Sequence, residues 1–110
     1  MVVKDRKIGD AVVLEVEGEI NFTSSPEFRR GFLKILDSKA QKVIVNLAGV
    51  AYVDSSGLAT LVEAHQKIKN AGGRLKLANL TPKVKSLFEI TKLEKLFEIY
   101  TTEEDALKSA

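Results

Sequence analysis

The sequence predicts an α/β fold in which helices, about four in number, pack on one mixed β-sheet of about four to five strands. Three observations lead to this fold class. A chain of 110 residues supports a single hydrophobic core, so residues 1–110 are expected to form one domain. The start of the chain alternates apolar and polar residues, which is typical of a β-hairpin. The remainder alternates amphipathic helical segments with short apolar runs, which is typical of strands joined by helices.

The predicted hairpin comprises residues 2–7 and residues 11–17, joined by the turn signal Gly9-Asp10. In the second run Val12, Leu14 and Val16 alternate with Val13, Glu15 and Glu17, which is typical of a strand. Residues 18–22 then continue in extended form or bend away.

A helix start follows at Ser24-Ser25-Pro26-Glu27. A hydroxyl cap, a proline in the first turn and an acid near the positive helix end are all typical of a helix N-terminus. One helical face then collects apolar side chains, namely Phe28, Phe32, Ile35 and Leu36. The next strand, residues 42–47, contains Val43-Ile44-Val45, which we expect to be buried on both sides, as in a parallel sheet.

A second helix is expected from Leu58 to Ile68, with its apolar residues on one side. Gly72-Gly73 suits the C-terminal cap of this helix, and residues 74–78 form the next strand. Thr81-Pro82 repeats the combination of cap and proline and begins a short amphipathic helix.

The last two predicted elements are short. Residues 96–100 predict an edge strand. Thr102 is expected to cap a final helix that carries Ala106 and Leu107.

Composition excludes several classes of function. The 17 basic and 15 acidic residues give a net charge of +2 and are interspersed, so no nucleic-acid surface is indicated. The chain has no Cys, which excludes a disulfide framework, a zinc ribbon and thiol catalysis. No window approaches the ~18 apolar residues of a membrane span, and the N-terminus lacks the apolar region of a signal peptide. We therefore expect a cytoplasmic protein that binds neither nucleic acid nor membrane.

The motif Asp54-Ser55-Ser56-Gly57-Leu58 lies where an apolar run gives way to the second helix. One interpretation is helix capping, in which a side chain accepts hydrogen bonds from free backbone N–H groups. The other is a site that another protein modifies, because one cap does not need three polar side chains. Gly57 is also a poor helix former, costing ~1 kcal/mol against Ala, and a small residue there lets another backbone approach. A phosphate on Ser55 would meet free N–H groups and the positive helix end.

Catalysis by Ser55 is disfavoured because no base is in reach. The single His, His65, lies ten residues further along the same helix. That spacing corresponds to ~15 Å at a rise of about 1.5 Å per residue. His65 falls on the apolar side and is interpreted as a packed histidine at the edge of the core. With one His, no Cys and no phosphate-loop motif, we expect no catalytic residue, no metal site and no cofactor.

A second polar stretch, residues 19–23, precedes the first helix and includes Ile20 and Phe22. In a mixed sheet this loop can lie at the same edge as the loop before Ser55. It is either a connection with its own hydrophobic anchor or a docking surface, and both interpretations stay open.

Together these features resemble the anti-sigma factor antagonist family, which is built on the STAS domain (sulphate transporter and anti-sigma antagonist). The resemblance covers nearly the whole chain and implies a single STAS-like α/β domain. It rests on Gly18-Glu19-Ile20-Asn21, residues 43–47, residues 50–58 with the Asp-Ser-Ser-Gly-Leu signature, and residues 72–79. Residues 81–97 look similar too.

The resemblance implies a phospho-switched regulator and not an enzyme. The unphosphorylated protein would bind an anti-sigma factor that is also a serine kinase, and so release a sigma factor. Phosphorylation of Ser55 would end the interaction, and a metal-dependent serine phosphatase would restore it. Asp54, Ser56 and Gly57 would shape the phosphosite, while ATP and magnesium would belong to the kinase. The implied partner contacts are Ile20, Asn21, Phe22, Thr23, Ser24, Leu58 and Thr60.

Two positions depart from the family pattern. Asn21 stands where the family usually has Asp, which removes a charge close to Ser55 and bears on partner specificity. Lys92 stands in a turn where the family often has Gly. Two alternatives stay open: a scaffold or sensory member of the fold that is never phosphorylated, and a weak nucleotide- or anion-binding domain that uses the N-terminus of the second helix.

Overall fold

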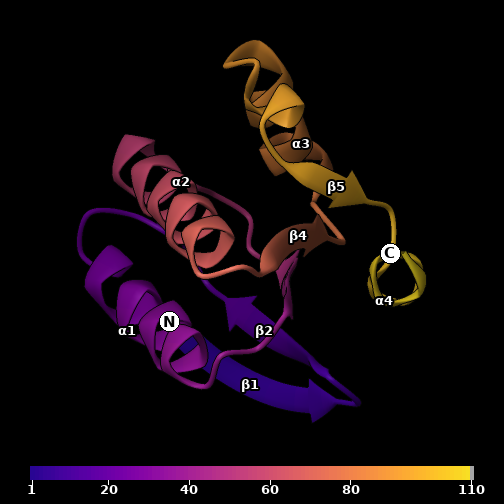
Figure 1. Cartoon of the computed structure of the whole chain (residues 1–110). Helices are drawn as coiled ribbons and strands as arrows, with labels where there is room; N and C mark the ends of the chain where they lie inside the picture. Colours follow the sequence, from indigo (N-terminus) through magenta and orange to yellow (C-terminus); the bar gives the residue numbers. More distant parts are fainter. Residues whose placement is uncertain (110) are drawn as a thin grey trace.

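The computed structural model describes residues 1–109. Two strands come first, and helices and strands then follow in alternation, as the sequence predicted (Figure 1). The elements are β1 (Val2–Ile8), β2 (Ala11–Glu17), α1 (Ser25–Asp37), β3 (Lys42–Gly49), α2 (Ser55–Asn70), β4 (Arg74–Ala78), α3 (Pro82–Ile90), the 3-10 helix η1 (Leu93–Lys95), β5 (Glu98–Tyr100) and α4 (Glu103–Lys108).

The strands of this part of the chain form one five-stranded mixed sheet in the order β1-β2-β3-β4-β5. β1 and β2 pair antiparallel, with Val2 opposite Glu17, while β2 to β5 pair parallel. The predicted hairpin and the predicted α/β class are both confirmed. Because parallel strands end at the same edge of a sheet, the loops that follow β2 and β3 meet there.

Helices cover the two faces of the sheet unequally. α1 and α2 lie side by side on one face, where alternate residues of β2 pack against Phe28 and Phe32 (Figure 1). α4 lies on the other face, where Val13, Ile44 and Ala106 belong to a second, smaller cluster. β2 is therefore buried on both sides at Val13. The expected burial of Val43-Ile44-Val45 is confirmed.

Two predicted side-chain caps are wrong. The Ser24 hydroxyl does not cap α1, since it donates to the carbonyl oxygen of Glu19 (2.6 Å) and accepts from the N–H of Asn21 (2.9 Å). The Thr81 hydroxyl does not cap α3, since it donates to the carbonyl oxygen of Val50 at 2.9 Å. Short hydroxyl side chains bond to whichever backbone group lies near, and here the fold brings loop carbonyls within reach.

Two other helix ends are as predicted. Thr102 caps α4 by accepting a hydrogen bond from the N–H of Asp105 at 3.1 Å. Gly72 has a φ of 89° and follows α2, and the N–H of Gly73 donates to the carbonyl oxygen of Ile68 at 2.9 Å. This is the glycine-dependent C-terminal cap in which a left-handed residue reverses the chain.

Two boundaries differ from the expected ones. α2 begins at Ser55 and not at Leu58, so both serines of the motif lie in its first turn. The last strand is limited to Glu98–Tyr100, because Leu93–Lys95 winds into η1. Lys92, just before η1, has a φ of 62°, in the left-handed region that favours glycine, and so occupies a turn as expected.

Polar contacts fix α4 to the sheet at both ends. The Glu103 carboxylate accepts from Nδ2 of Asn46 (3.0 Å) and from the Arg6 guanidinium (2.7 Å). At the other end the Lys42 ammonium donates to the carbonyl oxygen of Leu107 at 3.0 Å. Burial raises the pKa of Glu103, but the hydrogen bonds from Asn46 and Arg6 outweigh it, so this pKa lies below its ordinary value.

Glu103→Gln is expected to lower stability in neutral solution more than in acid. A carboxyl whose pKa is lower in the folded chain stabilises the fold above its unfolded pKa, and the contribution is lost as pH falls through the folded pKa. Near pH 7 the variant should lose about 1 kcal/mol of unfolding free energy, and near pH 3 the deficit should shrink. Urea unfolding at both pH values measures this, with the more exposed Glu104→Gln as control. An equal deficit at both pH values would contradict the assignment.

Candidate functional site

The Asp54-Ser55-Ser56-Gly57 motif lies at the sheet edge where β2 and β3 end (Figure 1). Asp54 is the N-cap of α2, with an extended backbone (φ −92°, ψ −175°). One oxygen of its carboxylate accepts from the N–H of Gly57 at 2.9 Å. The cap of α2 is therefore a carboxylate and not a serine hydroxyl.

The same carboxylate also holds the loop between β2 and α1. Its second oxygen accepts from the N–H of Phe22 at 3.0 Å. The backbone adds two hydrogen bonds of 3.0 Å, from the N–H of Asp54 to the carbonyl of Ile20 and from the N–H of Ile20 to the carbonyl of Tyr52. Ile20 and Val53 also form an isolated parallel bridge. The two polar loops, which the sequence allowed to lie at one edge, are thus side by side.

Gly57 makes this close approach possible. A Cβ at this position would lie 2.6 Å from the carbonyl oxygen of Ile20 and 2.7 Å from Cγ1 of Val53. Real Cβ atoms do not approach a backbone oxygen so closely, and the oxygen belongs to a paired segment that cannot move alone. Gly57 therefore allows the backbone of Ile20 to approach α2, as the sequence suggested for a small residue at this position.

The two serines differ in exposure. Ser55 is exposed, and its hydroxyl makes no hydrogen bond to any residue between 1 and 109. Ser56 is half-buried, and its carbonyl oxygen accepts from the hydroxyl of Thr60 at 2.9 Å. Because Asp54 performs the capping, the Ser55 hydroxyl has no part in capping the helix.

Asn21 organises the loop that faces the motif. Its side-chain oxygen accepts from the N–H groups of Thr23 and Ser24, each at 3.0 Å. Its side-chain nitrogen donates to the carboxylate of Glu19 at 3.3 Å. Asp at this position would accept the same two N–H groups but would place a second negative charge beside Glu19. The neutral amide of Asn21 therefore keeps the hydrogen bonds of the loop without adding a negative charge.

The structure divides the predicted contact residues into surface and interior. Phe22 is 81% exposed and Thr23 is exposed, while Leu58 is half-buried. Ile20 has no exposed surface, and Thr60 is 8% exposed with its hydroxyl bonded inside α2. Ile20 therefore lies beneath the surface of the site, whereas Thr60 contributes a small exposed area between α1 and α2.

Two hollows flank the start of α2. One, of about 590 Å³, lies between α2 and α3 and is lined in part by Ser55, Leu58 and Leu87. The other, of about 600 Å³, lies between α1 and α2 and is lined in part by Phe22 and Ser56. The motif thus occupies a ridge between two depressions.

Sequence reasoning missed the α3 side of this surface. Ile90 is 78% exposed and Tyr52 is 44% exposed, and both line the hollow beside Ser55. A signal was present, since Val84 and Phe88 define the buried stripe of α3 and Ile90 lies outside that stripe. A large apolar side chain on the outer face of a helix is informative when it lies next to a functional group.

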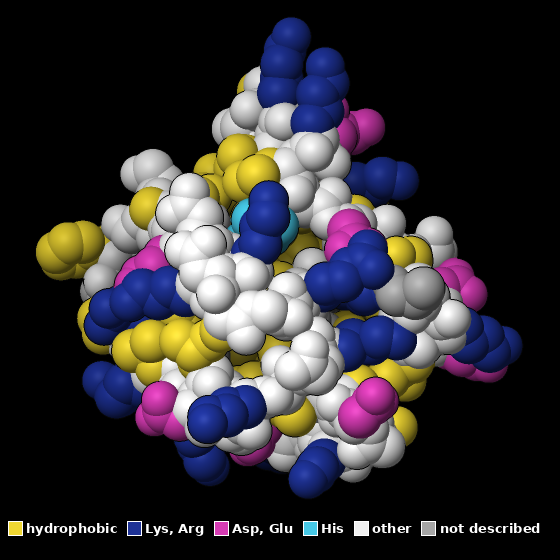
Figure 2. Space-filling view, viewed as in Figure 1, with side chains coloured by type: hydrophobic (Ala, Val, Ile, Leu, Met, Phe, Trp, Pro, Cys, Tyr) yellow, Lys and Arg dark blue, Asp and Glu magenta, His cyan; other side chains and the backbone are white. Residues whose placement is uncertain are grey.

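His65 lies far along α2 and takes no part in this site. Its ring packs edge-on against Phe97 with centroids 5.4 Å apart. Burial lowers the pKa of His65, and the nearby Lys69 lowers it further. Figure 2 shows the imidazole (cyan) at the surface of this face, with a basic side chain in front of it. The prediction of a packed histidine at the core edge agrees with this position.

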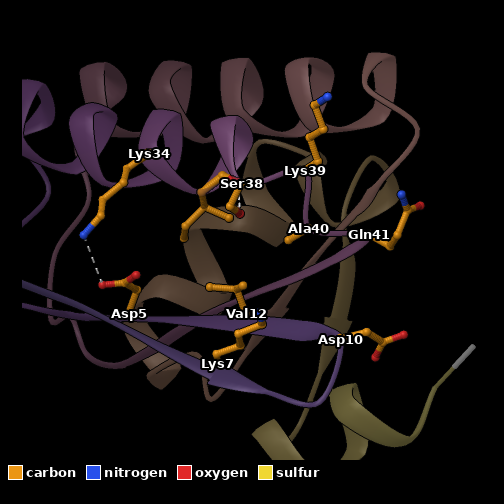
Figure 3. Close-up of a pocket in the computed structure, with 10 residues that line it drawn as sticks. Asp5, Lys7, Asp10, Val12, Lys34, Ser38, Lys39, Ala40 and Gln41 are labelled. Carbon is orange, nitrogen blue, oxygen red and sulfur yellow. Dashed lines mark hydrogen bonds and ion pairs between the residues drawn. The ribbon is translucent and has the colours of Figure 1, made fainter.

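A separate hollow of about 340 Å³ lies between the β1–β2 hairpin and the end of α1 (Figure 3). Lys34 and Asp5 approach to 3.9 Å across it, and Lys7, Lys39 and Asp10 also line it. It contains none of the motif residues. Among residues 1–109 no group of three or more His, Asp or Glu side chains is arranged to hold a metal ion. No helix in this same part of the chain has the length and apolarity needed to span a membrane.

Comparison with known proteins identifies the class. The family model of the STAS domain matches residues 3–106. The chain therefore belongs to the STAS domain family. One relative is the anti-sigma-B factor antagonist of Bacillus subtilis (strain 168), which is 32% identical over 97 residues, covering 88% of this chain and 88% of the relative.

Solved structures share the fold. An anti-sigma factor antagonist from Mycobacterium paratuberculosis gives a TM-score of 0.88 at 23% identity, covering 96% of this chain and 90% of that chain. The Bacillus cell fate determinant SpoIIAA in its phosphorylated form gives a TM-score of 0.72 at 21% identity, covering 96% of each chain. The family resemblance drawn from the sequence is confirmed.

Gly57→Ala is expected to destabilise the fold by about 1–3 kcal/mol, because the added methyl group forces α2 away from the backbone of Ile20. Ser55→Ala, two residues away and exposed, should change stability by no more than about 0.5 kcal/mol. Urea unfolding of both variants compares them. Equal stability of the two variants would show that the close approach at Gly57 is not a constraint.

Proposed function

We propose that this chain is a phospho-switched binding protein of the partner-switching kind, with no catalytic activity of its own. Unphosphorylated, it binds an anti-sigma factor that is also a serine kinase, and a sigma factor is released. Phosphorylation of Ser55 ends the interaction, and a metal-dependent serine phosphatase reverses the modification. The observation that carries the proposal is the exposed, unbonded Ser55 hydroxyl in the first turn of a helix that Asp54 caps.

The relatives support this proposal. Proteins that match most of the chain are anti-sigma factor antagonists, including those named for sigma-B and for sigma F. SpoIIAA, which shares the fold, has both an unphosphorylated and a phosphorylated form. Because a regulator of a sigma factor acts where transcription occurs, we assign this chain to the cytoplasm.

The proposed chemistry requires little of this chain. The kinase holds ATP and magnesium, and Oγ of Ser55 attacks the γ-phosphorus as ADP leaves and the hydroxyl proton passes to a base of the kinase. In the reverse direction, a metal-activated water of the phosphatase displaces the serine and inorganic phosphate is released. This chain contributes a nucleophile at a rigid helix start, and no existing hydrogen bond of the Ser55 hydroxyl must break first.

The proposed partner surface surrounds Ser55. Phe22 protrudes on one side of the motif, and Leu58 and Ile90 line the hollow on the other side. Exposed apolar anchors beside polar groups are typical of protein interfaces. Asn21, Thr23 and Ser24 would contribute the polar edge of this surface.

A phosphate would alter this surface without requiring a new fold. It adds about −1.5 to −2 charges next to the Asp54 carboxylate. Burying that charge against a partner is unfavourable unless the partner supplies compensating cations. The proposed result is dissociation of the complex.

Ser55→Ala is expected to bind its kinase as wild type does, within about threefold, and to accept no phosphate. Ser55→Asp should bind at least about tenfold more weakly, because its carboxylate carries part of the charge of a phosphate. Calorimetric titration with candidate anti-sigma factor kinases measures binding, and intact-mass spectrometry with peptide mapping locates the phosphate after incubation with ATP and magnesium. Wild-type affinity of Ser55→Asp would rule out the charge mechanism. A stable complex in which Ser55 is never phosphorylated would favour the scaffold alternative.

Phe22→Ala should weaken kinase binding by roughly 5- to 30-fold while leaving stability nearly unchanged, because the side chain is exposed in the free protein. Leu96→Ala is the matched control, since Leu96 is also partly exposed but lines a different hollow, with His65. The same titration compares the two variants. An equal effect of both would remove Phe22 from the proposed surface.

A further inference from the structure

A lysine side chain lines the hollow between α2 and α3 on the side opposite Ser55. Ser55, Leu58 and Asp54 line its α2 side, and Lys83 lines its α3 side. Lys83 is exposed and forms no ion pair with any residue between 1 and 109. Lys83 and Asp54 are the two charged side chains among the described residues that line this hollow.

The Asp54 carboxylate forms no ion pair with Lys83 in the part of the chain that the structure describes. Both of its oxygens are engaged by backbone N–H groups, at 2.9 Å from Gly57 and 3.0 Å from Phe22. The first turn of α3 contains no acidic residue either, so no neighbour on its own helix compensates the charge of Lys83. Among the described residues, Lys83 therefore carries a positive charge on the α3 side of the hollow that no ion pair compensates.

The two serines of the motif face different hollows. Ser55 lines the hollow with Lys83, whereas Ser56 lines the hollow with Arg29 and Arg30. Arg29 is already paired with Glu63 through hydrogen bonds of 3.0 Å. A group attached to Ser55 would therefore enter the hollow of Lys83, whose flexible four-carbon stem carries a compact point charge with three donors.

We propose that Lys83 binds the phosphoryl group on Ser55 within the same molecule, and that the phosphate so held covers the apolar hollow that a partner would otherwise occupy. This inference rests on the proposed function. The hollow has Leu87 and Ile90 on its far wall, so an ion pair across it replaces an apolar surface with a charged one. Lys83 is thus a positioning residue for the phosphorylated state, which gives phosphorylation an effect beyond simple repulsion.

The test uses protein with phosphoserine installed at position 55 during synthesis, so that it needs no kinase. Phosphorus NMR follows the second ionisation of the phosphate, whose ordinary pKa is about 6. A cation held nearby lowers this pKa, so Lys83→Gln should raise it by about half a unit in low salt, and about 1 M KCl should reduce the difference. Lys85→Gln is the matched control, because Lys85 lies on the same helix but lines another hollow.

Each outcome decides the inference. A rise in the pKa with Lys83→Gln, and none with Lys85→Gln, supports it. Equal values for the wild type and both variants overturn it, as does a larger rise with Arg30→Gln, which would assign the phosphate to the hollow between α1 and α2. Because position 55 carries phosphate by construction, these failures leave the proposed function intact. Failure of Ser55 to be phosphorylated by any kinase would instead count against the proposed function.

Discussion

The site depends on one carboxylate. Asp54 accepts hydrogen bonds from Gly57 in α2 and from Phe22 in the loop before α1, so a single side chain joins two segments that are far apart in the sequence. Hydrogen bonds to an ionised acceptor are roughly twice as strong as those between neutral groups, and a carboxylate has two oxygens to offer. The approach is possible because Gly57 has no Cβ to meet the carbonyl oxygen of Ile20.

This arrangement is consistent with the proposed role of Ser55 as a phosphorylation site. Asp54 caps α2, and Gly57 allows the close approach of the Ile20 backbone. The Ser55 hydroxyl beside them takes part in neither. The loop opposite keeps its shape in a similar way, since Asn21 accepts two backbone N–H groups and donates to Glu19. The replacement of a carboxylate by an amide at position 21 therefore changes the charge near Ser55 and not the architecture that presents it.

Much of the fold could be predicted because its signals are local. Hydrophobic periodicity located the strands and helices, and Gly72 marked the end of α2. The particular long-range hydrogen bonds and burials could not be predicted. The hydroxyls of Ser24 and Thr81 bond to loop carbonyls that only the fold brings near, and Val13 is covered by a helix more than eighty residues later. The motif itself was evident in the sequence, but the choice of Asp54 over the serines as cap, the burial of Ile20 and Thr60, and the exposed Ile90 required three dimensions.

The central claim is that the Asp54 carboxylate joins the loop at Phe22 to the helix start at Gly57. Amide hydrogen exchange in Asp54→Ala, compared with the wild type, tests it most directly. The account predicts that the N–H groups of Phe22 and Gly57 lose protection together, while the amides of β3 remain protected and Ser55→Ala leaves both groups unchanged. Full protection of Phe22 in Asp54→Ala would show that this N–H group does not depend on the carboxylate and would contradict the account.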